Sequence, residues 1–567
     1  MPQKRWTIRK HDREAVQKLS YALNVRPLLA ALLIARGHDT LEKALQFLNP
    51  SAEQLHDPYL LKGMHEAVAR IQKAVANGEK ILIWGDYDVD GTTGTVLLRK
   101  ALHLLGATTG FHVPNRFTEG YGINIPALEQ AQNDGYSLVI SVDCGIRSFE
   151  PLEWARGHGL DVIVTDHHLS DEVRGNPPAV AVVNPNQTGC KYPDKHLAGV
   201  GVAFKVAHAL LREAGKEDFV PQFLKIAAIG TVADVMDLTG ENRAIVALGL
   251  ADLPNTDSCG LKALMDVSDC RSDMTSYHIG FRIGPRINAA GRMDVAKHVI
   301  ELFEEPDFVK ARQLAGILDS RNRERQQMQQ KITELALSET ENHDGRHFVV
   351  VAGEGWHQGV IGLAASRIAE KLYRPTIVLS LKEGFGHGSA RSIPNFHLLN
   401  AMDTAADLFE QYGGHAAAAG MKIKVDNIES LRTRLNEHAS ATLTEEQLVP
   451  ELTIDALVTA DTLDLQLVEE LSMFEPFGAG NPKPVFLTRG LRLIGEPFVM
   501  KDKHLKLKLA DQSGKVFEAV WWDGVERSLG QTLKTNSRIE LAYVPEANSW
   551  QGNTRLQLVV EDLRADN

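Results

Sequence analysis

The chain has 567 residues and a mass of 62.4 kDa, which is too long for one hydrophobic core, so we expect about three or four domains of ordinary size. With 44% hydrophobic and 24% charged residues, the composition excludes an intrinsically disordered chain. The formal net charge of -12 argues against a nucleic-acid partner, since phosphate contacts need local positive charge, unless part of the acidic excess binds metal ions.

Residues 1–75 are predicted to form an N-terminal helical cap, because PLLAALLIARG and TLEKALQFLNP carry apolar residues at helical spacing. The apolar run from Leu28 to Ile34 is too short to cross a bilayer and lies too far into the chain for a signal peptide, so we expect no membrane association. The four cysteines form no CxxC pair and no zinc-ligand spacing, and we therefore expect free thiols in a cytoplasmic protein. These cysteines are Cys144, Cys190, Cys259 and Cys270.

Residues 76–300 are predicted to form a parallel α/β domain. Short apolar runs alternate there with helical stretches, as in sheets that are covered by helices on both faces. The runs are ILIW from residue 81, LVISV from 138, DVIVT from 161 and AVAVV from 179. Because functional groups collect beyond the carboxyl ends of the strands in such sheets, the residues that follow each run are the first candidates for a site.

Three of these runs are followed by side chains that bind metal ions. The candidates are Asp86, Asp88 and Asp90 after the first run, Asp143 after the second, Asp166, His167 and His168 after the third, and Asp234 at the end of an apolar, helix-like segment. Acidic residues and histidines make up about one residue in six, so three strand ends coincide by chance about once in two hundred. A single aspartate after a strand is usually a turn former or a helix N-cap, but the set as a whole favours a metal site.

A crowd of carboxylates is stable only when cations neutralise it. Oxygen ligands with one or two imidazoles and no thiolate favour Mn²⁺ or Mg²⁺ over zinc, and this number of ligands would serve two ions. Two such ions activate a water molecule and stabilise both oxygens of an in-line phosphoryl displacement. Phosphoester hydrolysis is therefore the expected reaction.

The remaining segments are predicted to be a linker, a smaller α/β domain and a β-barrel. Residues 301–340 are expected to contain a long linker helix, because the part after residue 306 has no Pro, has no Gly after Gly316, and is polar all round in its middle. Residues 341–447 show a second, smaller alternation in HFVVVAGEG and RPTIVLS. Residues 448–567 contain HLKLKLA, KVFEAVWW, RIELAYV and RLQLVV, whose apolar residues at every second position predict a β-barrel of the OB type.

The chain resembles the DHH phosphoesterases, and within them the RecJ exonucleases, over nearly its whole length. The likeness is carried by GDYDVDG at 85, VDCG at 142, DHH at 166 and ADVMDL at 233, and then by GPRINAAGRM at 284, GWHQGVIGLAASRI at 355, GSARSI at 388 and GGHAAAAG at 413. The resemblance implies a Mn²⁺- or Mg²⁺-dependent exonuclease that degrades single-stranded DNA from its 5′ end in recombination and repair.

The resemblance also implies roles for the clustered residues. The metal ligands would be Asp88, Asp90, Asp143, His167 and Asp234, with Asp143 between the two ions, while Asp86 and His168 would act in catalysis beside them. One departure is Trp84, which stands where the wider superfamily often has a histidine. Either Asp86 or water would then complete the ligands of that ion.

A strand end needs a phosphate pocket, for which guanidinium groups are the preferred partners. The candidates are Arg116 in VPNRFTEGYG and Arg286, Asn288 and Arg292 in PRINAAGR. An isolated surface arginine is more often simply solvated, but the resemblance favours Arg116 and Arg292 for the 5′ phosphate.

The glycines of GGHAAAAG would allow a close backbone approach to a phosphate and offer amide donors at a helix start, although alanine-rich helices also pack tightly. The resemblance makes His357, Ser389, Arg391 and His415 contacts of the DNA strand.

In HLKLKLA, Lys506 and Lys508 alternate with leucines, which predicts a basic face for DNA outside the barrel core. Four aromatic residues would stack on bases if exposed, but aromatics of this kind more often fill cores, so the lysines are preferred. The four are Phe477, Phe498, Trp521 and Trp522.

Single-stranded DNA is the expected partner of a monomeric protein, with a single-stranded-DNA-binding protein and a helicase as further candidate partners. One alternative is a DHH enzyme acting on short RNA, cyclic dinucleotides or polyphosphate, but such substrates do not need an extended strand-binding track. A second alternative is a non-catalytic binding module, against which the presence of every acidic ligand argues.

Overall fold

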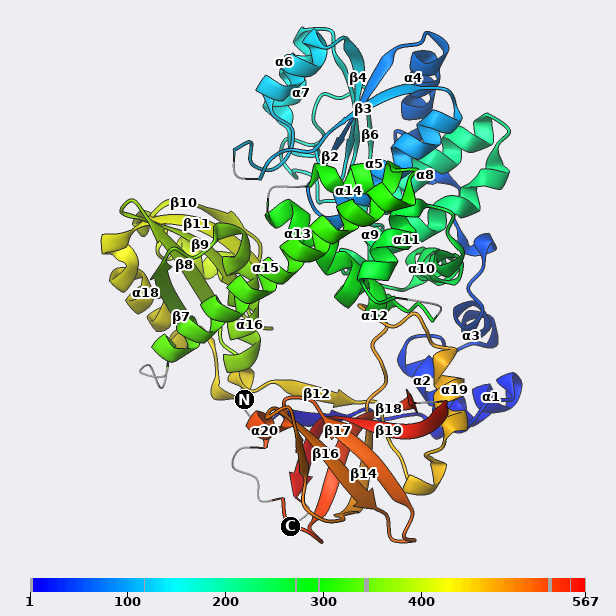
Figure 1. The fold of residues 1–567 in the computed structure, drawn as a ribbon, viewed down its shortest axis with the longest axis vertical. Coiled ribbons are helices and arrows are strands. Elements are labelled where there is room, and N and C mark those ends of the chain that lie inside the picture. Colours follow the sequence, from blue (N-terminus) through cyan, green and yellow to red (C-terminus); the bar gives the residue numbers. More distant parts are fainter. Residues whose placement is uncertain are drawn as a thin grey trace. The chain divides into compact units, whose positions relative to one another are not determined.

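The computed structural model describes residues 4–116, 118–270, 273–293, 296–340, 346–528, 533–550 and 552–565. Contacts divide the chain into two compact units. The first unit consists of residues 1–44, 325–473 and 483–567, and the second of residues 45–324 and 474–482. Figure 1 follows the chain through its helices and strands. The polypeptide passes from one unit to the other four times.

A five-stranded parallel sheet forms the centre of the second unit, in the order β3-β2-β4-β5-β6. The strands are β2 (Lys80–Gly85), β3 (Thr108–His112), β4 (Tyr136–Val142), β5 (Asp161–Thr165) and β6 (Ala181–Val183). Four of them coincide with the predicted apolar runs, which confirms the parallel α/β prediction. The edge strand β3, TTGFH, is only half-buried and gives no such signal. Because β2 lies between β3 and β4, the winding of the sheet changes direction between β2 and β4.

Helices cover both faces of this sheet. Three of them pack on one face and two on the other, so the central strands are buried on both sides and read as continuous apolar runs. The first face carries α4 (Met64–Ala76), α5 (Val89–Leu104) and α8 (Gly199–Glu213), and the second carries α6 (Ile125–Asn133) and α7 (Phe149–Gly157).

Further helices extend the second unit beside α5 and α8. They are α9 (Leu224–Ala233), α10 (Gly240–Asp252), α11 (Cys259–Val267), α12 (Ser276–His278), a π-helical turn (Ile279–Ile283), α13 (Gly284–Arg292) and α14 (Lys297–Glu304). The first turn of α10 carries three consecutive buried polar residues, Glu241, Asn242 and Arg243. Glu241 pairs with the ammonium of Lys205, and both side chains are fully buried. Such a pair is favourable only when its remaining hydrogen bonds are satisfied, and Glu241 also accepts from the Tyr192 hydroxyl.

Helix α15 (Phe308–Thr340) is a single element of 33 residues and confirms the predicted long helix. The division between the two units falls within it, between residues 324 and 325. The predicted domain boundaries themselves stay predictions.

A second sheet lies in the first unit, in the order β10-β11-β9-β8-β7. Only β7 and β8 are parallel, and the other pairs are antiparallel. One face packs on α16 and the C-terminal part of α15, and the other on α17 and α18. The strands are β7 (Val349–Glu354), β8 (Thr376–Lys382), β9 (Phe385–Arg391), β10 (Phe409–Gly414) and β11 (Ala418–Lys424), and the helices α16 (Gln358–Leu372), α17 (Leu398–Asp403) and α18 (Ile428–Thr442).

The tract GGHAAAAG does not start a helix, which corrects that expectation. Gly413 and Gly414 end β10, and Ala418 begins β11, so the tract forms the turn of an antiparallel hairpin. The alanines fit there because β11 pairs closely with β9 on its other side.

The C-terminal segments form the predicted β-barrel. Five strands pair in the order β14-β18-β19-β17-β16, and pairing of Arg492 and Leu493 in β14 with Ala510 and Leu509 in β16 closes them. The leucines of β16 face the core. The elements are α19 (Leu465–Ser472), β13 (Ala456–Leu457), β14 (Phe486–Leu493), β15 (Phe498–Met500), β16 (His504–Ala510), β17 (Val516–Trp521), α20 (Gly524–Arg527), β18 (Arg538–Trp550) and β19 (Asn553–Ala565).

The N-terminal segment contains the expected helices and, before them, an unexpected strand. Strand β1 (Arg5–Ile8) pairs in parallel with β12 (Glu451–Ile454), far along the chain. The helices are α1 (Arg13–Leu23), α2 (Pro27–Ala35) and α3 (Leu41–Leu48). Within the described residues no single helix has the length and apolar character to cross a membrane, although α1 and α2 taken together, with a bend of 113° between them, pass that test by length and composition. All four cysteines are free, as predicted.

Candidate metal centre

The predicted cluster lies at the carboxyl edge of the parallel sheet, where the winding changes direction. Asp86 follows β2, Asp143 follows β4, and His167 and His168 follow β5. Neighbouring parallel strands end side by side, so these loops meet, and ligand sites in open α/β sheets form at this point.

Asp88 and Asp90 are held by helix termini. Asp88 is the N-cap of α5, and its carboxylate accepts from the Gly91 amide at 3.0 Å. The buried carboxylate of Asp90 accepts from the amides of Gly199 (2.6 Å) and Val200 (2.7 Å) at the start of α8. These free amides and the positive end of the helix favour a negative charge, so α8 fixes Asp90 in place.

Asp143 adopts a left-handed backbone conformation, with φ of 63°, directly after β4. Strain of this kind in a non-glycine residue costs on the order of 1–3 kcal/mol and concentrates at functional sites. Gly199 leaves room for it, because a Cβ at residue 199 would lie 2.5 Å from the Asp143 Cβ. Only glycine at the start of α8 therefore permits this packing.

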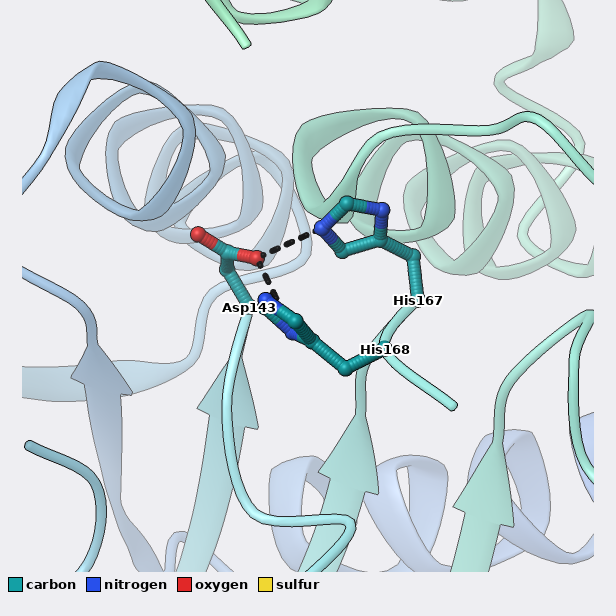
Figure 2. A group of neighbouring side chains, drawn as sticks. All are labelled: Asp143, His167 and His168. Atoms are coloured by element: carbon teal, nitrogen blue, oxygen red, sulfur yellow. Dashed lines mark ion pairs between the residues drawn. The ribbon is translucent and has the colours of Figure 1, made fainter. Parts of the chain in front are cut away.

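The His167 imidazole lies among three carboxylates. Its Nε2 is 3.1 Å from Asp143 Oδ1, 3.6 Å from Asp234 Oδ2 and 3.8 Å from Asp90 Oδ2. Asp234 reaches this point as the C-cap of α9, as the helix-like run predicted. Figure 2 shows one carboxylate oxygen of Asp143 facing both imidazoles, and His168 Nδ1 lies 3.9 Å from that oxygen.

Asp166 orients His168. Its buried carboxylate accepts from the amides of Ile146, His167 and His168 and from His168 Nδ1 at 2.8 Å. Although burial alone lowers the pKa of His168, the hydrogen bond to Asp166 raises it to about 9. The half-exposed His168 is therefore a cation at neutral pH, held at the edge of the cluster.

The carboxylates repel one another strongly. Burial, followed by the charge of Asp88, raises the pKa of Asp90 to about 7, and burial together with Asp90 raises that of Asp234 to about 9. Burial and the neighbouring aspartates also raise the pKa of Asp86 and of Asp143 well above the usual range. In contrast, burial lowers the pKa of His167 to about 4, so this imidazole is neutral, which is the form that binds metal ions.

These residues fit divalent metal ions. Asp86 Oδ1 and Asp143 Oδ1 are buried and, among the described residues, accept no hydrogen bond. A cation supplies what such oxygens lack. Three overlapping groups have donor atoms within 4.8 Å of one another: Asp143, His167 and His168; Asp90, His167 and Asp234; and Asp86, Asp88 and Asp143. All seven residues to which the resemblance gives a role at the centre thus come together, and Asp143 connects the group without histidine to one that contains His167.

Three residues near the cluster carry no role in the sequence analysis. Tyr121 donates from its hydroxyl to the Asp143 carbonyl at 3.3 Å, and its ring lies edge-on to that of His168. Asn186 donates to the His167 carbonyl and Asn184 to the His168 carbonyl. The two asparagines follow β6, so the fourth apolar run gave a signal for them that the search for ionisable side chains passed over.

The phosphate candidates of the second unit differ in their surroundings. Arg116 stacks over the Tyr87 ring at 4.2 Å, beside Asp86. Arg292 is half-buried at the end of α13, next to Gly291, where a Cβ would lie 2.2 Å from the Tyr87 carbonyl oxygen. Arg286 instead pairs with Asp319 and donates to two backbone carbonyls, which gives it a packing role.

Asn288 is half-buried in the middle of α13. It lies outside the three groups of metal-binding side chains, and its contact with substrate stays a prediction.

The candidates of the second sheet gather at the start of α16. His357 is the N-cap of this helix, and Arg391 donates to Ser389 Oγ at 3.1 Å. Both β9 side chains face Gly362, where a Cβ would lie 2.9 Å from Ser389 Oγ and 3.1 Å from an Arg391 nitrogen. His415 is exposed in the turn before Ala418, which pairs with Arg391.

On the barrel, Lys506 and Lys508 lie on the outer face of β16, as predicted. Lys506 pairs with Glu518 at 3.0 Å. Of two adjoining surface hollows, one includes Lys506 and the other includes Lys508 and Lys515, and both also include Arg555. The first hollow also contains Trp550, whose side chain is 74% exposed. Neither Arg555 nor Trp550 was predicted from the sequence as a contact for DNA.

Of the aromatic residues considered for stacking, Phe498 and Trp522 are exposed, whereas Trp521 is buried and Phe477 is half-buried. The preference for the lysines over the rings stays a prediction.

Three segments of the chain match known family models. Residues 80–231 match the family model of the DHH family N-terminal domain, residues 345–441 that of the DHHA1 domain, and residues 454–562 that of the RecJ OB domain. The chain is 39% identical to the single-stranded-DNA-specific exonuclease RecJ of Bacillus subtilis, over 98% of this chain and 70% of that protein. It is 35% identical to the protein of that name from Dickeya dadantii, over 94% of this chain and 96% of that protein.

Comparison with solved structures also finds RecJ proteins. The crystal structure of RecJ from Thermus thermophilus in complex with Mn²⁺ is 29% identical, with a TM-score of 0.86, and the match covers 100% of this chain and 80% of that one. The same protein in complex with Mg²⁺ gives a TM-score of 0.80 at 29% identity, covering 100% of this chain and 79% of that one.

Proposed function

The chain belongs to the RecJ family of single-stranded-DNA-specific exonucleases, and on this premise we propose that it removes nucleotides from the 5′ end of single-stranded DNA, using two Mn²⁺ or Mg²⁺ ions, in recombination and repair. The observation that carries the proposal is the buried cluster of Asp86, Asp88, Asp90, Asp143 and Asp234 around His167.

We assign the ligands in two sets that share Asp143. Asp90, His167 and Asp234 would hold one ion, and Asp86 and Asp88 would hold the other, which accounts for the absence of a histidine at Trp84. The Trp84 indole is buried and cannot coordinate metal, so Asp86 takes that place. When bound, the ions supply water activation and neutralise charge on the scissile phosphate.

The protein groups around this centre hold and orient the substrate. His168 is positively charged at neutral pH and half-exposed, so it donates to a non-bridging oxygen of the phosphate and stabilises the charge that develops there. Asp166 keeps that imidazole in place through Nδ1. Arg116, packed on Tyr87 beside Asp86, binds the 5′ phosphate together with Arg292.

Beyond the scissile bond, the DNA strand contacts residues at the start of α16 and residues on the β-barrel. At the start of α16, His357, Ser389 and Arg391 present donors to backbone phosphates. On the barrel, Lys508 and Arg555 neutralise phosphates, and the exposed Trp550 offers a stacking surface for a base. Such a track suits a polymer and is unnecessary for a dinucleotide.

The test is digestion of 5′-labelled single-stranded DNA with Mn²⁺ by the wild type and by Asp143→Asn. Asparagine tolerates the left-handed backbone at this position but lacks the shared negative charge, so we expect hydrolysis to be lost while DNA binding in a mobility-shift assay is retained. The matched control is Asp269→Asn, at an exposed aspartate that also has positive φ, and it should cleave normally.

Undiminished turnover by Asp143→Asn would contradict the assignment. Rapid cleavage of dinucleotides by a wild type that leaves single-stranded DNA intact would instead favour a DHH enzyme of small substrates.

We also infer a cytoplasmic monomer that works with a single-stranded-DNA-binding protein and a helicase. Free cysteines support a reducing compartment. An exonuclease for single strands needs another activity that unwinds duplex DNA, which supports the helicase. We further propose that residues 1–75, 76–300, 301–340, 341–447 and 448–567 act as the cap, catalytic, linker, substrate-binding and nucleic-acid-binding parts.

A further inference from the structure

A nine-residue segment from the C-terminal half of the chain forms part of the second unit. Residues 474–482, FEPFGAGNP, are preceded by α19 and followed by β14, both of which belong to the first unit. The segment itself packs with residues 45–324, although it begins 150 residues after residue 324 in the sequence. We call it the 474–482 segment.

Arg243 anchors the start of this segment. Arg243 is 2% exposed, and its guanidinium donates to the carbonyls of Phe474 (3.0 Å), Glu475 (2.7 Å) and Phe47 (2.9 Å). The ring of Phe474 is fully buried and meets that of Phe47 edge-on at 5.5 Å. A planar group with several fixed donors holds backbone carbonyls more rigidly than an ammonium does.

The segment is also held at its middle and its end. The Ser276 hydroxyl donates to the Phe477 carbonyl. The buried Asn481 amide donates to the carbonyls of Phe474 (2.8 Å) and Pro476 (3.0 Å), which closes the segment on itself. Its shape is therefore fixed by buried hydrogen bonds.

The middle of the segment contacts the loop that follows Asp234. The Leu238 amide donates to the Ala479 carbonyl at 2.8 Å. A Cβ at Gly478 would lie 2.7 Å from Leu238 Cδ1, and one at Gly480, where φ is +69°, would lie 3.0 Å from the Asp237 Cβ. The glycines thus allow the two backbones to approach closely.

The first residues of this loop bond back to α9, with the Val235 amide donating to the Val232 carbonyl at 3.2 Å. Asp234 ends α9, and Val235 has a positive φ of 58° and is 72% exposed. The Met236 amide donates a hydrogen bond to the Thr231 carbonyl. The next amide that fixes the loop is that of Leu238, and its acceptor comes from the 474–482 segment.

Asn242, next to Arg243, connects the same loop to the residues that hold Asp90. Its amide donates to the carbonyls of Asp237 (3.2 Å) and His196 (2.6 Å). Three residues after His196, Gly199 donates to Asp90. Asn242 therefore links the loop that the segment contacts to the chain just before Gly199, which holds Asp90.

We propose that the 474–482 segment positions Asp234 for metal binding, so that the metal centre is complete only when this C-terminal segment is seated on the second unit. The inference rests on the proposed function for the identity of the ions. Gly480 and Arg243 are positioning residues in this account, because neither touches metal or substrate.

The experiment compares Gly480→Ala with Gly495→Ala in the full-length protein. Gly495 also has positive φ (+75°), but a Cβ there meets no atom within 4 Å, so the two variants share the backbone strain and differ in the contact with the loop. Binding of Mn²⁺ is measured by calorimetry, and the thermal midpoint of the metal-free protein is measured alongside. We expect Gly480→Ala to weaken Mn²⁺ binding about tenfold, as changes to residues that orient metal ligands do, and Gly495→Ala to leave it unchanged.

A kinetic signature accompanies this result. Cleavage by Gly480→Ala should be low at limiting Mn²⁺ and recover at saturating Mn²⁺. If Gly480→Ala does not fold, Ser276→Ala tests the proposal instead. This change removes one hydrogen bond to the segment and keeps nearly the same side-chain volume. We expect it to lower the Mn²⁺ affinity by a smaller factor than Gly480→Ala would.

Mn²⁺ affinity equal to that of the wild type in the folded variant, with only a lower thermal midpoint, would overturn the proposal. A wild type that binds Mn²⁺ but does not cleave single-stranded DNA would refute the proposed function instead, while the comparison of metal affinities would still decide the present inference.

Discussion

Replacing Asp234 by asparagine should abolish metal-dependent hydrolysis and at the same time stabilise the metal-free protein. In the absence of metal, burial and the neighbouring Asp90 raise the pKa of Asp234 from 3.8 to about 9. The folded state therefore holds this proton more tightly than the unfolded state does. The stability that the proton contributes is complete below about pH 4 and is lost as the pH rises towards 9.

The size of the effect on stability follows from the interval between the two pKa values of Asp234, 3.8 in the unfolded state and about 9 in the folded state. Each pH unit costs about 1.4 kcal/mol, so at pH 8 the metal-free wild type has lost on the order of 5 kcal/mol. Asparagine has no proton to lose. We expect the variant to be more stable than the wild type by a few kcal/mol at pH 8, which corresponds to a thermal midpoint roughly 5 °C higher. The difference should shrink at pH 6.

The assay is thermal unfolding in EDTA at pH 6 and pH 8, followed by digestion of single-stranded DNA with Mn²⁺. Asp269→Asn serves as the control, because Asp269 is exposed and should leave both midpoints unchanged. An Asp234→Asn protein that is less stable than the wild type at pH 8, or a difference that does not change with pH, would refute the electrostatic reasoning.

Three further predictions concern other parts of the chain. Lys205→Met leaves the buried carboxylate of Glu241 without its cation and should lower the free energy of unfolding by about 3–5 kcal/mol in urea titrations; a change within experimental error would show that the pair is dispensable. Arg292→Ala should reduce the preference for 5′-phosphorylated over 5′-hydroxyl DNA, and an unchanged preference would remove Arg292 from that role. Lys508→Ala and Arg555→Ala should each reduce the salt dependence of single-stranded DNA binding by about 0.7 in the log–log slope, and identical slopes would place the strand elsewhere.

The sequence predicted those parts of the fold in which burial imposes a clear period. Strands β2, β4, β5 and β6 are buried on both faces, and β16 alternates between core and solvent. Their patterns of apolar residues could therefore be recognised in the sequence. Strands β9 and β11 were not predicted, because FGHGSAR and AAGMKIK are rich in glycine and alanine and are defined by their pairing with each other. The same reason explains why GGHAAAAG was read as a helix start.

The metal cluster was predicted because strand ends converge in a parallel sheet whatever the detailed packing. The 474–482 segment gave no such signal. Its contacts with Leu238 and Arg243 use backbone carbonyls, which every residue has, and they join positions more than 200 residues apart. The role of Arg243 depends on burial, and burial is not visible from its position in the sequence.

The parallel pairing of β1 with β12 has a consequence for biosynthesis. Residues 5–8 leave the ribosome well before the strand that receives them, which is made about 440 residues later. At about 5–20 residues per second, this strand remains an open edge for roughly 20 to 90 seconds, while the second unit can already fold. A fusion tag joined directly to the N-terminus extends that exposed edge, so we expect the yield of native protein to depend more on the length of an N-terminal linker than on that of a C-terminal one.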